Sequence, residues 1–108
     1  MANTFKNSFS KSVGTSAATI YTCPSATQTT LIGLSVANTT TSPITCDAYI
    51  TSSAVDYYLV KTATVPVGGS LVIVGGDQKV VMEVADALKI VSSAASSADV
   101  VVSFLEIT

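Results

Sequence analysis

The sequence predicts an all-β fold: a single-domain antiparallel β-sandwich, jelly-roll or immunoglobulin-like, with about eight strands and an extended N-terminal arm. Short stretches rich in β-branched and aromatic residues recur roughly every ten residues, which is the strand spacing of sandwiches. Clusters of Pro, Gly, Asn, Asp and Ser separate these stretches and mark turns. A chain of 108 residues suits one domain. We therefore expect an arm over residues 1–14 and a β-sandwich domain over residues 15–108.

The N-terminal segment is polar apart from Phe5 and Phe9 and shows no strand pattern. Terminal segments of this kind are ordered only when they are packed against something. We expect this arm to lie on a neighbouring subunit, with the two aromatic side chains as its contacts.

The first half of the domain contains three predicted strands. The stretch AATIYTC at 17–23 is rich in β-branched and aromatic residues and ends at a proline. TTLIGLSVAN at 29–38 follows a polar turn and contains Gly33, a residue that in strands often marks a bulge. ITCDAYIT at 44–51 alternates between its two faces, which is typical of a half-buried antiparallel strand.

Three further strands follow in the middle of the chain. YYLVKTATV at 57–65 ends at a proline. SLVIV at 70–74 and KVVMEV at 79–84 are expected to form a hairpin around Gly75-Gly76-Asp77, because the glycines of that turn allow positive φ.

ALKIVSS at 87–93 and VVVSFLEIT at 100–108 complete the predicted sandwich. A helix is the alternative only over 81–91, where the propensities are mixed. The density of β-branched residues there favours two strands joined by a bend at Ala85-Asp86.

Several of these strands carry apolar side chains on both faces, although a strand in a two-layer sandwich needs only one apolar face. In 70–74, for example, Val72 and Val74 alternate with other apolar residues. The chain's own loops or the arm could cover the second face. Monomers seldom expose large apolar patches, however, and we interpret this face as a protein–protein interface. The candidate interface residues are Phe5, Phe9, Val72, Val74, Val101, Leu105 and Ile107.

No catalytic, metal or cofactor site is expected, and we predict that the chain is not an enzyme. It contains no His, the commonest general base and metal ligand. Most of its Asp residues fall in predicted turns, where Asp bonds the local backbone. Glu83 and Glu106 lie on strands and are expected to be solvated or to lie in an interface. The two Gly-Gly pairs lack the pattern of a phosphate-binding loop.

Composition also argues against nucleic-acid and membrane partners. The net charge is −2 and the five Lys residues are scattered, without any Arg, whereas nucleic-acid binding needs a basic face. No apolar run approaches the roughly 20 residues of a membrane helix, and the N-terminus lacks the apolar core of a signal peptide. Cys23 and Cys46 lack metal-type spacing and are expected to behave as small hydrophobes; a disulfide between them stays open.

The surface chemistry favours a subunit that lies close to its neighbours. Thirty residues are Ser or Thr and only 11% are charged, so electrostatic repulsion between copies is weak. A glycan-binding module, with Tyr49, Tyr57 or Tyr58 stacking on sugar, is an alternative. Packing of these tyrosines in the core or an interface is favoured, because Trp, the commonest sugar-stacking side chain, is absent.

Two long stretches, IYTCPSATQTTLIGLSVAN at 20–38 and TVPVGGSLVIVGGDQKVVMEVADALKIVSSAASSADVVVSFLEI at 64–107, carry a resemblance to a known group. They resemble small virion structural proteins of tailed bacteriophages, of the cyanophage and marine-phage type. The matching residues belong to turns and strands. The Gly-Asp expected before the penultimate strand reads Ala85-Asp86 in this chain, which removes the glycine from the bend.

The resemblance implies a capsid decoration (cement) protein that binds the outside of the shell of major capsid protein and stabilises it. It also implies a homotrimer located in the virion after assembly in the bacterial host cytoplasm. The lack of a cysteine framework fits that reducing compartment. A neck, tail or fibre-base component of the virion is the alternative.

Overall fold

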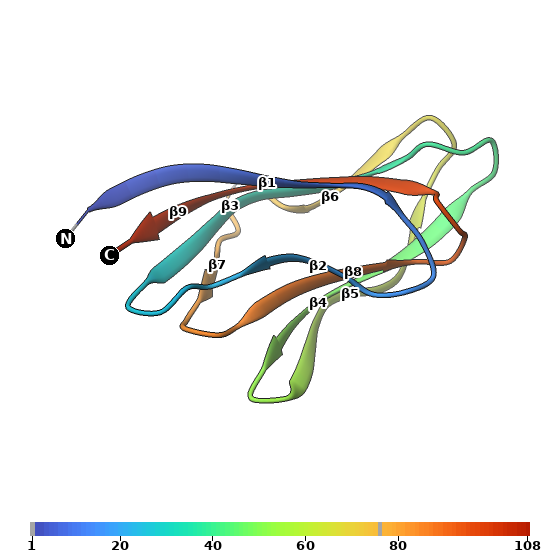
Figure 1. The fold of residues 1–108 in the computed structure, drawn as a ribbon. Coiled ribbons are helices and arrows are strands. Elements are labelled where there is room, and N and C mark those ends of the chain that lie inside the picture. The colour runs from blue at the N-terminus through green and yellow to red at the C-terminus, as the bar shows by residue number, and fades with distance from the viewer. Residues whose placement is uncertain (1, 76) are drawn as a thin grey trace.

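The computed structural model describes residues 2–75 and 77–108, and it confirms the all-β sandwich (Figure 1). Two antiparallel sheets pack face to face. The first sheet contains, in spatial order, β1 (Asn3–Val13), β9 (Ala98–Ile107), β3 (Gln28–Asn38) and β6 (Ser70–Val74), with β7 (Val80–Met82) also paired to β3. The second sheet contains β2 (Ala18–Thr22), β8 (Ala87–Ser92), β4 (Ile44–Ser52) and β5 (Val55–Val65).

The strand order is that of a jelly roll, one of the two expected topologies. The chain crosses from one sheet to the other at every connection except the β4–β5 hairpin and the passage from β6 to β7. This places β1 over β2, and β5 beside β6, at the two sides of the sandwich. Double-sheet jelly rolls leave edge strands on both sheets. Whether the unpaired backbone N–H and C=O groups of each edge strand are accessible therefore decides which edges can pair with another chain.

The core lies between the sheets and follows the alternation of the sequence. In β8 and β9 every second residue is buried, because successive side chains in a strand point to opposite faces. The largest fully buried side chains come from both sheets: Leu31, Leu34, Val36, Met82, Leu88 and Ile90.

The expected N-terminal arm is instead part of the sandwich. Residues Asn3 to Ser10 pair in continuous antiparallel register with β9, and Val13 is buried in the core. Sequence alternation missed this strand because its inward side chains are polar as well: Thr4, Lys6, Ser8 and Ser10. They are tolerated there because β1 lies at the edge, where Ser8 donates a hydrogen bond to the Ile20 carbonyl at 2.7 Å.

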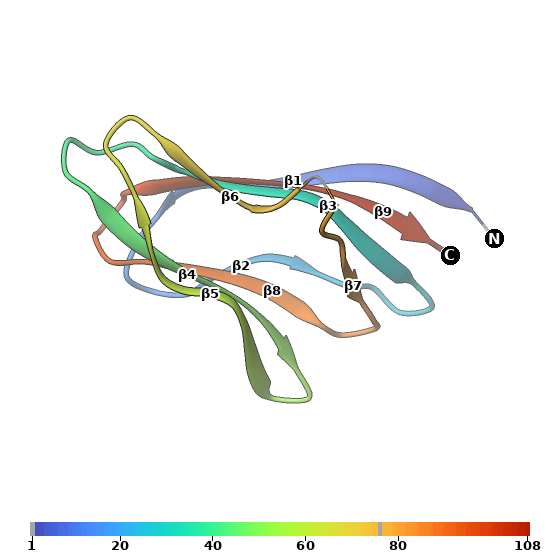
Figure 2. The same cartoon turned by 180° about the vertical axis from the view of Figure 1, so that it is seen from behind.

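The expected hairpin between 70–74 and 79–84 is wrong. Strands β6 and β7 both pair with β3 and lie one after the other along it, as Figure 2 shows. β3 has 11 residues and is long enough for two short partners in line. The middle of the proposed turn, Gly76, lies outside the described residues.

The bend at Ala85-Asp86 is confirmed, and no part of 81–91 is helical. The Asp86 N–H donates to the Glu83 carbonyl at 3.0 Å, and the Glu83 N–H donates to the Asp86 carboxylate at 3.0 Å. Ala85 has φ of +71°. Glycine adopts this conformation without the steric cost that a Cβ imposes.

Replacing Ala85 with Gly should therefore stabilise the fold. A left-handed φ costs a non-glycine residue about 1–2 kcal/mol, and the substitution removes this strain. Glycine also gives the unfolded chain more conformational freedom, which lowers the stability by about 0.4–1 kcal/mol. We expect a net stabilisation of about 0.5–1 kcal/mol, measured by equilibrium urea unfolding. Ala87→Gly is the matched control: it lies two residues on, at the start of β8, and should destabilise by a similar amount. Equal effects of the two substitutions would contradict the role assigned to φ.

Candidate interaction surface

The outward side of the first sheet, which we call the outer face, carries two rows of mainly apolar side chains. One row crosses the sheet from β1 to β7 and the other from β1 to β6. In one row the neighbours are Phe5, Leu105, Thr30 and Val81. Such directly opposed residues have Cβ atoms about 4.5–5.5 Å apart, close enough to form a continuous surface. Phe5 is 76% exposed and Val81 is 65% exposed.

The second row lies four residues from the first, counted from Phe5 to Phe9 on β1 and from Leu105 to Val101 on β9. Here Phe9 lies opposite Val101, Val101 opposite Ser35, and Ser35 opposite Val72. Phe9 and Val72 are each 66% exposed. Between the two rows, a shallow depression is lined by residues that include Phe5, Asn7, Ile32 and Ser103.

The outer face is nearly free of charge. On its three longest strands, β1, β9 and β3, the outward-pointing charged residues are Lys11 and Asp99, and these two pair with each other at 3.2 Å near one end. The opposite side of the molecule differs, since the outward residues of the second sheet include Asp47, Lys61 and Lys89. A neutral, apolar sheet face loses little on desolvation and is suited to contact with another protein.

The structure brings together six of the seven candidate interface residues. Phe5, Phe9, Val72 and Val101 are exposed on the outer face. Leu105 and Ile107 point the same way from β9 and are half-buried.

Val74 is the exception and corrects the prediction, because it is fully buried in the core. A β-bulge interrupts the pairing of β3 with β6. Leu34 lies opposite Val74 but the next residue, Ser35, lies opposite Val72, so the register shifts by one residue. Bulges reverse the direction of subsequent side chains. Val81 and Ile32 were missed as candidates, although in the stretch 79–84 Val81 alternates with Val80 and Met82.

Of the three candidate sugar-stacking tyrosines, Tyr49 and Tyr58 contact each other. Tyr57 and Tyr58 are both exposed, and as neighbours in β5 they point to opposite sides. Tyr49 is buried and its ring lies 5.0 Å from that of Tyr58. The Lys61 ammonium lies 4.5 Å from the centre of the Tyr58 ring. Tyr58 thus already contacts a second ring and a cation, an arrangement that does not favour stacking on a sugar.

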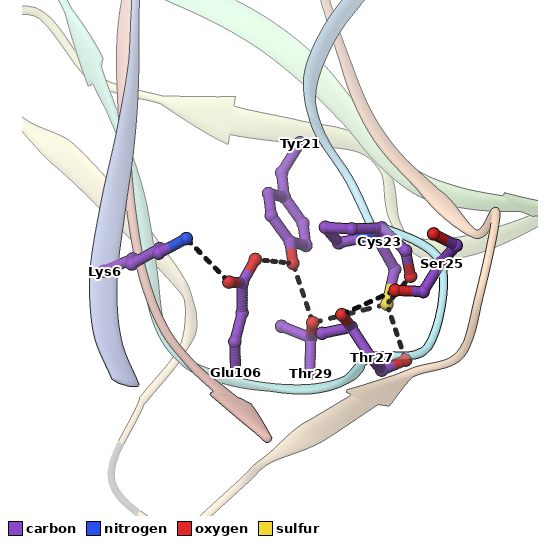
Figure 3. Close-up of polar contacts among 8 residues, drawn as sticks. Lys6, Tyr21, Cys23, Ser25, Thr27, Thr29 and Glu106 are labelled. Carbon is purple, nitrogen blue, oxygen red and sulfur yellow. Dashed lines mark hydrogen bonds and ion pairs between the residues drawn. The ribbon is translucent and has the colours of Figure 1, made fainter. Parts of the chain in front are cut away.

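Beneath the first row of the outer face, a polar cluster joins the two sheets (Figure 3). The Lys6 ammonium lies 2.8 Å from one oxygen of Glu106, and the Tyr21 hydroxyl donates to the other at 2.6 Å. The Thr29 hydroxyl lies 2.7 Å from the Tyr21 oxygen. Glu106 is only 5% exposed, so the expectation of a solvated or interfacial carboxylate was wrong. Its neighbours supply the hydrogen bonds that a buried carboxylate requires.

The cluster shifts the pKa of both of its central groups. The hydrogen bond from Lys6, and then that from Tyr21, lowers the pKa of Glu106 because both favour the carboxylate. Burial is the main reason that the pKa of Tyr21 is raised, and the adjacent Glu106 raises it further. Glu106 is therefore ionised and Tyr21 is neutral over the whole physiological range.

Both cysteines are free thiols in the core. Cys23 Sγ lies 3.3 Å from the Thr27 carbonyl oxygen and 3.4 Å from Thr29 Oγ1. Burial raises the pKa of Cys46, with a further contribution from Asp47. Neither thiol is placed to react at the surface.

Within 2–75 and 77–108, no group of three or more His, Cys, Asp or Glu side chains is arranged to hold a metal ion. The same residues contain no helix that is long and apolar enough to span a membrane.

Comparison with known proteins gives a fold likeness and no family. No protein-family model and no curated protein matches the chain. Among solved structures it is similar to a chain from Bacillus endospore appendages, described as a novel family of disulfide-linked pili. The TM-score is 0.58 and the identity 18%, over 99% of this chain and 87% of that chain. At this identity the likeness concerns the fold alone.

Proposed function

We propose that the chain is a structural, non-enzymatic protein of a tailed-bacteriophage virion, a capsid decoration protein that works as a homo-oligomer. It binds the outside of the shell of major capsid protein through the outer face of its first sheet. The observation that carries this proposal is the outer face itself: two exposed apolar rows on a sheet whose long strands present almost no charge. A face of this kind gains free energy when it is covered, at roughly 25 cal/mol per Å² of apolar area.

The mechanism is added contact area. A standard-size interface buries about 800 Å² on each partner, and each bound copy would add such a contact between the shell and itself. Repeated over the particle, these contacts oppose the outward pressure of packaged DNA. No catalytic group is needed for this role.

Two further observations support an assembling subunit. Jelly rolls recur in viral capsid proteins, which is an analogy at the level of fold. The neighbour with a similar fold comes from Bacillus endospore appendages and is described as belonging to a family of disulfide-linked pili. Cys23 and Cys46 of the present chain are buried, so the contacts proposed for it include no disulfide.

The copy number of the chain in purified phage particles, counted against the major shell protein by quantitative mass spectrometry, tests the proposal. A number comparable with that of the shell protein supports decoration. About a dozen copies or fewer, as closed rings of a neck or tail give, would assign the protein to that part of the virion. Its absence from particles would refute a virion role.

The outer face is tested separately with Val72→Lys and Val101→Lys, two exposed positions of the second row. Each places a charge in the proposed contact and should lower occupancy on particles at least tenfold, since burying an unpaired charge is costly. Thr64→Lys is the control: it introduces the same side chain at an exposed position of β5 in the second sheet. Equal loss in all three variants would contradict the assignment of the outer face.

A further inference from the structure

The four edges of the sandwich differ in how well they are protected against pairing with another chain. β2 has five residues and a register shift, and the edge formed by β6 and β7 is interrupted between them. β5 contains two register shifts and Thr62 with φ of +54°, beside Lys61. Short strands, bulges and lysines are the usual means by which proteins protect sheet edges.

β1 differs from the other three edges. It has 11 residues, its register with β9 is continuous from Asn3 to Ser10, and its irregularity begins only after Ser10. The sequence of that stretch contains no proline, and its one lysine, Lys6, is paired with Glu106 at 2.8 Å. Its side facing away from β9 therefore offers a regular row of backbone donors and acceptors.

The hydrogen bonds at the start of β1 show which residues face that open edge. Ala2 and Thr108 exchange both backbone hydrogen bonds, at 3.1 and 2.9 Å. Because such pairs alternate in an antiparallel ladder, the even-numbered residues of β1 bond to β9. Asn3, Phe5, Asn7 and Phe9 consequently direct their N–H and C=O groups to the open edge.

We propose that β1 is a dimerisation strand, which pairs antiparallel with β1 of a second copy about a two-fold axis at Asn7. In this register Phe5 lies opposite Phe9 of the second copy, and Phe9 opposite its Phe5. All of these residues direct backbone groups to the open edge, as the ladder requires. Two aromatic cross-strand pairs then form on the outer face, the kind of pair that stabilises a sheet.

The side chains select this register over its neighbours. Shifting the axis by one residue, to Lys6, would place the two Lys6 side chains opposite each other, which is unfavourable. Shifting it the other way, to Ser8, would place Phe5 opposite Lys11 and Phe9 opposite Asn7. The axis at Asn7 instead sets Lys6 opposite Ser8, so that the sequence from Thr4 to Ser10 is complementary to itself.

The pairing would also extend the outer face. The row that ends at Phe5 in one copy continues into the row that begins at Phe9 in the other, so that the first sheets of both copies form one sheet crossed by mainly apolar rows. The partner is a second copy of this chain, whether or not the protein binds a capsid. A two-fold contact predicts a dimer in place of the homotrimer that the phage resemblance implies.

Sedimentation velocity of the purified chain tests the oligomeric state. The expected mass is twice the 11.0 kDa of the chain, and a monomer at all concentrations or a trimer would overturn the proposal. Asn7→Pro should convert the dimer to a folded monomer, because it removes an outward N–H and leaves the bonds from β1 to β9. Circular dichroism verifies its folding, and Asn7→Ala, which keeps the N–H, should remain dimeric.

The register is tested by oxidation of Asn7→Cys with oxidised glutathione. At the two-fold axis the two introduced thiols would sit on a hydrogen-bonded pair with Cα atoms about 5.5 Å apart, within the range a disulfide spans. A covalent dimer should form, with no contribution from the buried native cysteines. Asn3→Cys, an exposed position on the same strand, should stay largely monomeric on a non-reducing gel. Equal cross-linking of the two variants would overturn the register.

Discussion

Replacing Phe104 with Ala is expected to destabilise the protein by about 3–5 kcal/mol, the range for truncating a buried aromatic side chain. Phe104 lies on the inner side of β9 and is 3% exposed. Its ring centre is 4.1 Å from that of Tyr21 on the other sheet, with the planes tilted by 40°. The substitution therefore removes apolar burial, a ring–ring contact between the sheets and the support for the Tyr21 hydroxyl.

A domain of this size is stabilised by about 5–15 kcal/mol in total, so this single change should remove a large part of its stability. Equilibrium urea unfolding measures it, and the melting temperature should fall by at least about 10 °C. Phe9→Ala is the matched control, because Phe9 belongs to the same sheet but is 66% exposed. At a protein concentration low enough to keep the chain monomeric it should cost no more than about 0.5 kcal/mol. A similar loss in both variants would contradict the division of this sheet into a buried and an exposed face.

The sequence was sufficient to predict the strands that bury apolar side chains against the opposite sheet. β2, β3, β4, β8 and β9 were all predicted to within a few residues. In β8 and β9 every second residue is buried against the opposite sheet, and this burial imposes the period of two that the sequence displays.

β1 was not predictable in the same way, because neither of its faces is consistently apolar. What holds it is pairing with β9 and the ion pair between Lys6 and Glu106, and both depend on residues about a hundred positions away. The polar cluster could not be predicted either: Lys6, Tyr21, Thr29 and Glu106 come from four strands. Only the jelly-roll topology brings them together.

Most of the interface candidates lie on the outward side of their strands, as expected, since alternation alone decides which side of a strand a residue occupies. The prediction failed at Val74, where a bulge in the β3–β6 ladder reverses the side chain. It also failed for the Gly75-Gly76-Asp77 hairpin, because a glycine-rich connection between short apolar strands does not reveal which strand each one pairs with. Local sequence sets the turn, whereas the length of β3 decides that β6 and β7 share one partner.

Acid should weaken the fold through Glu106. Since its pKa is lowered in the folded protein, the unfolded chain binds protons more readily as the pH falls below about 5. The contribution of Glu106 is therefore present in full above the pKa of an unfolded glutamate, near 4.3. It is lost as the pH falls through the lower folded value. The free energy of unfolding, measured by urea titration at a series of pH values, should decrease over this window.

Glu106→Gln should lower stability by about 1.5–3 kcal/mol at neutral pH, the usual worth of hydrogen bonds to a charged group. Its deficit should shrink in acid, because the wild-type carboxylate loses its advantage once it is protonated. Asp99, whose pKa is lowered mainly by the hydrogen bond from the Ser12 N–H, would leave some acid sensitivity in the variant. Glu83→Gln, at an exposed position before the Ala85 turn, should change stability by no more than about 0.5 kcal/mol. A deficit in Glu106→Gln that is constant from neutral pH into acid would mean that shape, and not charge, makes Glu106 necessary where β1, β9 and β2 meet.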